Sequence, residues 1–490
     1  MRSCALVGVT PVPVEVEICV SGGLPGMHIV GMVDTAVQEA RHRVRSAVRA
    51  AGFKMAEEHV VVNMVPAELR KSGSAFDLPI ALAYLIATGQ LRPEPFENAL
   101  AVGELTLRGK VREVAGTMAY ACGAKEWGLE LISAPVSTML PKLPGLEHKC
   151  LPSLGALRTG EFQPPHCDCA VEGSAAPDYR DVVGQDTALR AMLIAAAGGH
   201  GVMLVGPPGS GKSMLAKRLP SILPPLTPQE QVECAVIHSV AENDIAPIAL
   251  GHRPFRQPHH SATVPALVGG GRPLRPGEAS LAHNGVLFLD ELGEFSGTAL
   301  QALRQPMEDG CITICRAEGR AVFPARFQLV AASNPCPCGY LGDREQACKC
   351  SETQVNRYQG KLGGPLRDRI DLVCEVQRVD PARVMQTGRG VESAVLRDQV
   401  MAARERFEAR GDVRGDLAST VPARVIKACG LGETQTALVE RVARVNNMSG
   451  RGIVRTLRVA RTIADLADNA QVKDEHLMEA LMYRGVGGLE

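Results

Sequence analysis

Residues Gly206 to Ser213 read G-P-P-G-S-G-K-S, which fits the phosphate-binding loop pattern G-x-x-x-x-G-K-[ST]. Glycines let the backbone N–H groups of such a loop approach a phosphate, and the N-terminus of the following helix attracts its negative charge. Lys212 is expected to bind the β- and γ-phosphates, and Ser213 is expected to bind Mg²⁺. The predicted ATP-binding residues are Gly206, Pro207, Pro208, Gly209, Ser210, Gly211, Lys212 and Ser213.

Two adjacent carboxylates, Asp290 and Glu291, directly follow the apolar run 286–289. That run is typical of a buried parallel strand, whose carboxyl end would bring both acids beside the phosphate loop. Asp290 is expected to complete the Mg²⁺ site, and Glu291 to polarise the water that attacks the γ-phosphate. Asn334 follows the next strand-like segment, where its amide would orient the same water or form an ordinary turn. Together these residues predict hydrolysis of ATP.

Four of the 15 cysteines lie close together, at Cys336, Cys338, Cys348 and Cys350, which is far denser than an even scatter would give. Four thiolates suit a tetrahedral Zn²⁺ ion, so we expect a structural zinc site there. The C-x-C spacing is less diagnostic than C-x-x-C, and a thiol-bearing loop without metal is the alternative. Cys167 and Cys169 have no second pair nearby, so no metal is expected at that position.

These groups need a parallel sheet to bring them together, and residues 178 to about 376 alternate strand-like with helix-like segments. Val202-Met-Leu-Val205, for example, predicts a buried strand that leads into the phosphate loop. Before this region, 14–18 and 60–63 alternate like strands, and 34–51 has the spacing of an amphipathic helix. After it, helix-like segments cover 392–410, 422–429, 433–447, 455–469 and 473–483.

The sequence therefore predicts a multidomain α/β protein with a P-loop parallel-sheet core. The expected parts are an amino-terminal α+β domain at 1–165, a linker at 166–177, the nucleotide-binding core at 178–376 and a helical domain at 377–490.

The composition is electrically balanced, with 53 Lys plus Arg and 53 Asp plus Glu in 490 residues. Any contact with nucleic acid must therefore come from local patches. No apolar run approaches the ~20 residues that a membrane span requires, and Glu15 and Glu17 interrupt any early apolar core. With many cysteines and no export signal, we expect a cytoplasmic protein without a membrane partner.

Two arginine-rich segments are candidates for DNA contact. The first, 253–277, makes the stretch between Lys212 and Asp290 longer than one strand-helix-strand step needs and is expected to be an inserted loop or hairpin. The second, 312–322, reads as a hairpin. Ordinary solvated loops look similar, but both segments offer arginines to phosphates. The candidate DNA-binding residues are Arg272, Arg275, Arg316 and Arg320. His259 and His260 have no acidic or thiol partner close by, so no metal is expected there.

The motifs resemble the YifB/ComM group of magnesium-chelatase-like AAA+ ATPases over nearly the whole chain. The resemblance rests on the phosphate loop and on the segments 22–31, 70–79, 276–291, 334–339, 364–371 and 458–466. It implies a homo-hexameric ring with ATP and Mg²⁺, in which Asn334 is sensor 1. It also implies that Arg369 is the arginine finger given to a neighbouring subunit and that Arg458 is sensor 2, with Arg455 and Arg461 as rivals. The implied activity is branch migration or unwinding of single-stranded or branched DNA during natural transformation.

The amino-terminal part resembles the Lon protease domain, whose Ser-Lys dyad it lacks. Ala75 stands where the serine belongs and Met118 where the lysine belongs, while Ser74 is displaced by one residue. The domain is therefore expected to be non-proteolytic and to serve assembly or DNA engagement. The carboxyl-terminal helices resemble a helical lid.

Two other function classes remain open. A magnesium-chelatase ATPase subunit is expected to begin near the nucleotide-binding core, which would leave residues 1–165 unexplained. A protein-remodelling ATPase would use the same ring and the same ATP site.

Overall fold

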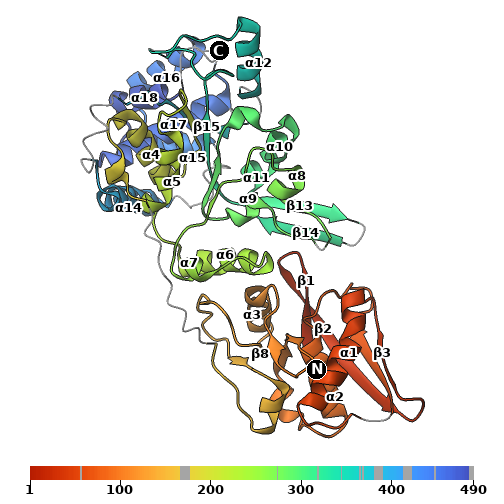
Figure 1. Ribbon diagram of the computed structural model, residues 1–490. Coiled ribbons are helices and arrows are strands. Elements are labelled where there is room, and N and C mark those ends of the chain that lie inside the picture. Colours follow the sequence, from red (N-terminus) through yellow and green to blue (C-terminus); the bar gives the residue numbers. More distant parts are fainter. Residues whose placement is uncertain are drawn as a thin grey trace.

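The fold is that of a computed structural model of the chain. The structure describes all residues except 56–57, 166–176, 273, 317–318, 344, 363–365, 367–368, 380–389, 412–421, 446–447 and 485–490. The predicted linker at 166–177 thus lies almost entirely outside the described residues. Figure 1 shows the amino-terminal part at the bottom, a central sheet with its hairpin, and the carboxyl-terminal helices at the upper left.

A seven-stranded sheet of order β3-β4-β2-β1-β5-β8-β9 organises the amino-terminal part. Its strands are β1 (Arg2–Val7), β2 (Thr10–Ser21), β3 (Gly26–Val30), β4 (His59–Val65), β5 (Ala99–Ala101), β8 (Glu130–Ser133) and β9 (His148–Cys150). The short pair β6 (Glu104–Leu105) and β7 (Val111–Arg112) lies beside it, with α1 (Thr35–Ala50), α2 (Asp77–Ala87) and α3 (Thr117–Glu126). Asp34 caps α1 by accepting a hydrogen bond from Val37 N at 2.9 Å. The strands and the helix expected here are confirmed.

A five-stranded parallel sheet of order β11-β12-β15-β10-β16 forms the central part and confirms the predicted sheet. Its strands are β10 (Val202–Val205), β11 (Phe255–Arg256), β12 (Val286–Leu289), β15 (Gln328–Ser333) and β16 (Leu372–Glu375). Every residue of β10 and β12 is buried, as continuous apolar runs in a parallel sheet require. Because all five strands run the same way, their carboxyl ends gather at one edge.

Several helices belong to the central part together with this sheet. They are α4 (Asp186–Gly198), α5 (Lys212–Ile222), α6 (Pro228–Val240), α7 (Ala246–Ala249), α8 (Val264–Val268), α9 (Glu278–Leu281), α10 (Gly297–Ala302), α11 (Arg304–Asp309) and α12 (Glu352–Leu362). The predicted hairpin at 312–322 is confirmed as β13 (Cys311–Arg316) paired with β14 (Gly319–Pro324).

The predicted insertion at 253–277 is only partly correct. Residues 255–256 form β11, which pairs with β12 and so belongs to the core sheet. Arg253 donates to the carbonyls of Pro224 and Asn284, and Arg256 pairs with Glu278 at 2.7 Å. These two arginines are structural. Later in the segment lies α8, and beyond it Gly270 and Arg275 pair in an isolated bridge.

The carboxyl-terminal helices are α14 (Ser393–Ala409), α15 (Pro422–Cys429), α16 (Glu433–Val445), α17 (Gly450–Leu466) and α18 (Asp474–Met482). They share one buried apolar cluster with the helices on the central sheet, in which Val400 and Ile463 pack with Leu219. The helical part is therefore firmly packed on the central part. No helix within the described ranges is both long and apolar enough to span a bilayer.

The amino-terminal part docks on the central part at two places. Helix α3 lies against α6, where Met118 packs with Leu226 and Cys234 (Figure 1). The turn between β1 and β2 packs against the hairpin, because a Cβ on Gly8 would lie 3.0 Å from the Ala321 Cβ. The amino-terminal part therefore contacts the hairpin that carries two of the candidate DNA-binding arginines.

Candidate active site

The phosphate loop joins the carboxyl end of β10 to the first residue of α5, as the sequence predicts. Gly206 is enclosed so tightly that a Cβ there would lie 2.0 Å from the carbonyl oxygen of Val376. Gly209 and Gly211 have φ of 76° and 87°, a left-handed conformation that glycine adopts without strain. The loop therefore needs these glycines to turn its N–H groups toward the start of α5.

Lys212 reaches back across the loop. Its Nζ donates to the carbonyls of Gly206 at 2.7 Å and Pro207 at 2.8 Å, and lies 3.3 Å from Asn334 Oδ1. Burial lowers the pKa of Lys212, although the charges of Asp290 and Glu291 oppose this shift. The lysine and the Asn334 amide thus lie side by side at the phosphate loop.

Ser213 and Asp290 are joined by a hydrogen bond of 2.8 Å from Ser213 Oγ to Asp290 Oδ2. The two residues come from α5 and from the end of β12, which lie at the same edge of the sheet. One hydroxyl and one carboxylate in this position fit the protein ligands that hold Mg²⁺ in P-loop enzymes. The donor set therefore suits the predicted metal.

Glu291 contacts a residue that the sequence analysis set aside. Its side chain is 58% exposed, and Glu291 Oε2 lies 3.4 Å from His260 Nδ1. The expectation that no acid lies near His260 is wrong, because β11 and β12 are parallel neighbours and bring the two segments to one edge. The His259 ring packs on the His260 ring, with the centroids 4.1 Å apart, and His259 Nδ1 lies 2.7 Å from Ser261 Oγ. Within the described residues, the cysteine cluster is the only set of three or more His, Cys, Asp or Glu side chains whose ligand atoms lie close enough together to hold one ion.

Gln185 was not predicted from sequence, since a lone glutamine before a helix gives no signal. Its amide donates to the carbonyl of Ser210 at 2.9 Å and to that of Gln377 at 2.8 Å. Gln185 therefore ties the phosphate loop to the segment that follows β16.

The predicted arginine finger lies at the other edge of the sheet. Arg369 precedes β16, and its guanidinium is buried and paired with Glu308 of α11. Gly201, which accepts hydrogen bonds from Asp371 N and Leu372 N, precedes β10, whereas the phosphate loop follows that strand. Four residues of β10 separate the two edges by about 13 Å. Arg369 is therefore remote from the phosphate loop of its own chain.

The sensor 2 candidates share the edge of Arg369. Arg455 Nε lies 3.8 Å from Asp371 Oδ1, and Arg458 lies close enough to act on the charge of the same carboxylate. Arg461 instead holds helices together, since it donates to the carbonyl of Ala470 at 2.8 Å and pairs with Asp465 at 2.9 Å. Arg455 and Arg458 thus remain as candidates, and neither lies beside the phosphate loop.

Asp371 is the carboxylate among these arginines, and its Oδ2 lies 3.3 Å from His200 Nδ1. Burial alone would raise its pKa, but the His200 hydrogen bond and the charges of Arg458 and Arg455 outweigh burial and hold the pKa below its ordinary value. Nearby, Arg455 Nη1 and Arg458 Nε are buried without a hydrogen-bond partner among the described residues. Asp371 Oδ1 is likewise buried without a hydrogen-bond partner among these residues, so the arginines act on this carboxylate by charge rather than by hydrogen bonds.

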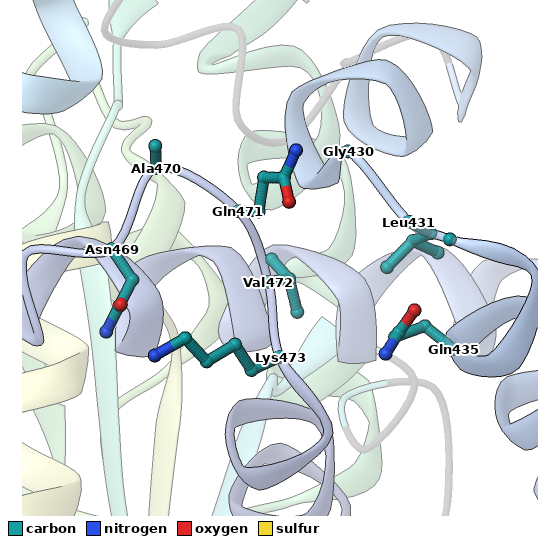
Figure 2. A pocket seen from close by; sticks show the side chains of 9 residues that line it. Gly430, Leu431, Gln435, Asn469, Ala470, Gln471, Val472 and Lys473 are labelled. Carbon is teal, nitrogen blue, oxygen red and sulfur yellow. The ribbon is translucent and has the colours of Figure 1, made fainter.

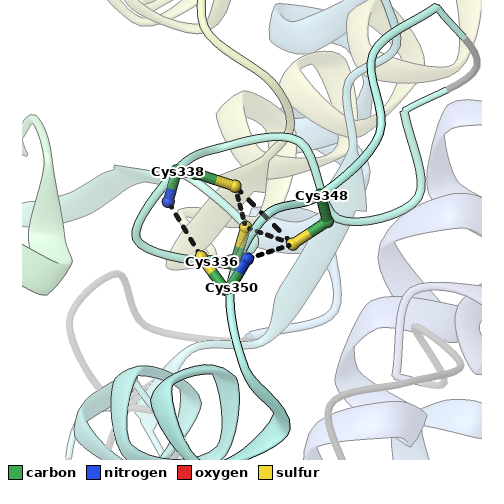
Figure 3. A group of neighbouring side chains, drawn as sticks. All are labelled: Cys336, Cys338, Cys348 and Cys350. Carbon is green, nitrogen blue, oxygen red and sulfur yellow. Dashed lines mark hydrogen bonds between the residues drawn. The ribbon is translucent and has the colours of Figure 1, made fainter.

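The four predicted cysteines come together in one loop between β15 and α12 (Figure 3). Cys336 Sγ lies 3.4 Å from Cys338 Sγ and 3.7 Å from Cys348 Sγ, and the four sulfurs lie within 4.8 Å of one another. Tetrahedral zinc with Zn–S bonds of 2.3 Å needs sulfurs about 3.8 Å apart. Backbone N–H groups of Tyr340 and Lys349 lower the pKa of the Cys338 thiol to about 6, whereas burial raises the pKa of Cys336. The group therefore fits Zn²⁺.

The cysteine loop touches the phosphate loop directly. A Cβ on Gly339 would lie 2.6 Å from Pro208 Cδ in the phosphate loop. On its other side, α12 reaches two segments of the site: Gln359 donates to the Pro335 carbonyl at 3.4 Å, and Lys361 to the Gly293 carbonyl at 3.4 Å. The loop thus connects the phosphate loop, the sensor 1 segment and the turn after Glu291.

The candidate DNA-binding arginines lie on the turn at 270–275 and on the hairpin. Arg272 and Arg320 are exposed, and Arg275 lies 3.2 Å from Glu242 in a solvent-exposed pair. Arg316 ends β13 opposite Gly319, but its side chain lies outside the described residues. The side chains of Arg272, Arg275 and Arg320 are thus exposed to solvent, and exposure alone does not identify a ligand.

The two residues that the resemblance aligns with the protease dyad are both buried. Ala75 is 5% exposed and Met118 is 0% exposed, and Met118 packs against the central part. Ser74 Oγ donates to Glu104 Oε2 at 2.6 Å. This arrangement agrees with a domain that lacks the Ser-Lys dyad.

An open hollow of about 640 Å³ lies among the carboxyl-terminal helices (Figure 2). Its wall consists of residues 430–432, Gln435 and residues 469–473. None of the predicted site residues lines it.

P-loop ATPases carry a phosphate loop after one strand of a parallel sheet and adjacent carboxylates after the strand next but one. This chain has the same arrangement. Comparison with known families narrows the class. The family model described as magnesium chelatase, subunit ChlI, matches residues 178–384, and the model for the carboxyl-terminal part of that subunit matches 390–484. A third model, subunit ChlI of Mg-chelatase, matches 16–137.

Relatives match the chain from end to end. Competence protein ComM of Haemophilus influenzae is 41% identical, with 99% of this chain and 97% of the relative covered. A protein named YifB of Salmonella typhimurium is 40% identical, with 99% and 96% covered. The chain belongs to the YifB/ComM group of magnesium-chelatase-like AAA+ proteins.

The similarity to chelatase subunits themselves is shorter. The magnesium-chelatase 67 kDa subunit of Chlorobaculum parvum is 31% identical over 32% of this chain and 23% of its own length. The family model that matches residues 16–137 also carries the chelatase name, so the amino-terminal part does not by itself separate the two classes. What separates the YifB/ComM group from the chelatase subunits is the share of this chain that the relatives match, 99% for the Haemophilus relative and 32% for the Chlorobaculum subunit.

Proposed function

We propose that the chain is an ATP-hydrolysing motor that assembles into a homo-hexameric ring and acts on DNA. Branch migration or unwinding of recombining DNA during natural transformation is the specific activity. The name of the Haemophilus relative, competence protein ComM, supports this role, and the relative matches 99% of the chain. A reducing compartment suits the 15 cysteines, so the proposed location is the cytoplasm.

The observation that carries the proposal is the division of the catalytic groups between two edges of the central sheet. Lys212, Glu291 and Asn334 lie with the phosphate loop, while Arg369 and Arg458 lie at the opposite edge. A complete site then requires two copies arranged head to tail, and an interface of this kind gives a ring when its rotation closes. Both arginines would act on the γ-phosphate of the neighbouring subunit, and Arg369 would exchange Glu308 for that phosphate.

Within one site, each residue has a distinct task. Lys212 and the loop N–H groups bind the phosphates, and Glu291 polarises the attacking water, which Asn334 orients. His260 is proposed to position Glu291 through their contact. Mg²⁺ held by Ser213 and Asp290 would neutralise charge on the β- and γ-oxygens. Zinc on the four cysteines would brace the loop between Asn334 and Arg369.

The proposed domains follow the same division of labour. Residues 1–165 would form a Lon-protease-like domain without protease activity, joined by 166–177 to the ATPase core at 178–376, with a helical lid at 377–490. The burial of Ala75 and Met118 supports the loss of protease chemistry. Arg272, Arg275, Arg316 and Arg320 are proposed to line the ring pore, and their combined replacement by alanine should weaken DNA binding regardless of sequence.

Stimulation of ATP hydrolysis by single-stranded DNA tests this function. A DNA motor should hydrolyse ATP several times faster when DNA is bound. The alternative is a chelatase-type ATPase subunit or a protein-remodelling ATPase, and the chelatase names of the three family models favour considering it. ATP turnover that ignores DNA would support that alternative.

A further inference from the structure

A row of arginines runs along the exposed face of α1. Arg41, Arg45 and Arg49 follow each other at intervals of four residues, so they lie about 6 Å apart along one face of the helix. Arg41 and Arg49 are exposed and Arg45 is half-buried. The adjoining face of α1 packs into the amino-terminal core through Val37, Ala40, Val44, Ala47 and Val48.

Two arginines from other segments extend this row at the end of α1. A Cβ on Gly52 would lie 2.6 Å from Arg158 Nη1, which places that guanidinium just beyond the helix. The turn that carries Arg108 packs on the same end, since a Cβ on Gly109 would lie 3.1 Å from the Ala47 carbonyl oxygen. Both arginines are exposed. We call the five residues Arg41, Arg45, Arg49, Arg108 and Arg158 the α1 arginine patch.

Little of this charge is neutralised by the protein. Glu39 is the one acid of α1, and it lies 3.8 Å from Arg43, which points away to pair with Asp77 at 2.6 Å. No arginine of the patch forms an ion pair with an acid in the part of the chain that the structure describes. The local excess stands against a whole chain with equal numbers of basic and acidic residues.

Helix stability explains only part of the patch. Arg49 and Arg158 lie at the carboxyl end of α1, where cations stabilise the helix dipole. Arg41 and Arg45 lie in the middle of the helix, where that effect has faded. A regular row of guanidinium groups instead matches a polyanion with evenly spaced charges.

We propose that the α1 arginine patch binds the phosphate backbone of single-stranded DNA. The inference rests on the proposed DNA motor and locates one contact of that motor in the amino-terminal part. Only 3% of the residues in the chain are aromatic, so this contact should be independent of base sequence. The docking of α3 on α6 and of Gly8 on the hairpin fixes the patch relative to the ATPase core. DNA held there would keep its position relative to the hairpin.

The test compares variants of the full-length protein by fluorescence anisotropy with a labelled single-stranded oligonucleotide over a range of salt concentrations. Replacing Arg41, Arg45 and Arg49 by glutamine should weaken binding by at least about tenfold at low salt. Because each phosphate contact contributes about 0.7 to the slope of log affinity against log salt, the slope should flatten by about two units. Replacing the same residues by lysine should leave the slope unchanged.

A matched control removes three exposed charges elsewhere, with Lys427→Gln, Arg441→Gln and Arg444→Gln in the carboxyl-terminal helices. This control should bind as the wild type does. If the wild type binds DNA and the Arg41, Arg45 and Arg49 variant binds equally with an equal slope, the inference is wrong and the proposed function stands. A wild type that binds no DNA contradicts both. Loss of binding to anionic lipid vesicles, with DNA affinity unchanged, would also overturn the inference.

Discussion

Two inactive variants should restore each other's activity, because the proposed site takes its phosphate loop from one copy and Arg369 from the next. Lys212→Ala should abolish ATP binding, since that Nζ spans the loop to Asn334. Arg369→Ala should bind ATP but hydrolyse it about 10³ to 10⁵ times more slowly, which is the usual contribution of an arginine finger and equals about 4 to 7 kcal/mol.

The fold should survive the loss of Arg369. Its partner Glu308 has a side chain that is 48% exposed, so the carboxylate can be solvated when the arginine is removed. The positive charge of Arg369 also disfavours the neighbouring Arg455, and the substitution relieves this repulsion. The melting temperature should therefore stay close to that of the wild type.

Mixed rings give the quantitative result. With equal amounts and random assembly, about one quarter of the interfaces join an intact phosphate loop to an intact Arg369. Phosphate release at saturating ATP should therefore rise from a baseline near zero to about one quarter of the wild-type rate. If native mass spectrometry shows mixed rings and the rate stays at the baseline, Arg369 does not act on a neighbouring subunit.

Three other predictions concern the surroundings of the ATP site. Purified protein should contain one zinc per chain, and Cys336→Ser with Cys348→Ser should remove the zinc and lower both the melting temperature and the ATPase activity. Replacing the cysteines at 167 and 169 should change neither property. Metal analysis that finds no zinc would refute the site. His260→Asn should lower kcat by roughly tenfold and leave the KM for ATP unchanged, and an unchanged kcat would contradict the proposed role of His260. Gly339→Ala should raise the KM for ATP by pressing on Pro208, whereas Gly342→Ala, which has a similar φ and open space around it, serves as the control.

Local patterns predicted the catalytic edge well. The strands 202–205 and 286–289 are continuous apolar runs, and such runs have few alternatives to a buried parallel strand. The phosphate loop and the four cysteines are short-range motifs, so their spacing alone indicates that they come together. The helices after residue 390 follow from their amphipathic periodicity, which does not depend on the neighbouring elements.

These local patterns could not predict contacts between segments that are distant in the sequence. Strand β11 has two residues and no apolar run, so its place beside β12 depends on the whole sheet. The contact between His260 and Glu291 follows from that pairing and could not be foreseen without it. The pairing of Arg369 with Glu308 is likewise a product of tertiary packing, as is the structural role of Arg461. The sequence shows which residue types stand at these positions, but it does not show which residues they contact.

The central claim, a DNA motor of the YifB/ComM group, is tested most directly by steady-state ATP hydrolysis of the full-length protein with and without single-stranded DNA. The account predicts that DNA raises the rate several-fold and that Glu291→Gln, which still binds ATP and DNA, shows almost no turnover in either condition. An active wild type whose rate is the same at every DNA concentration, including low salt, would contradict it.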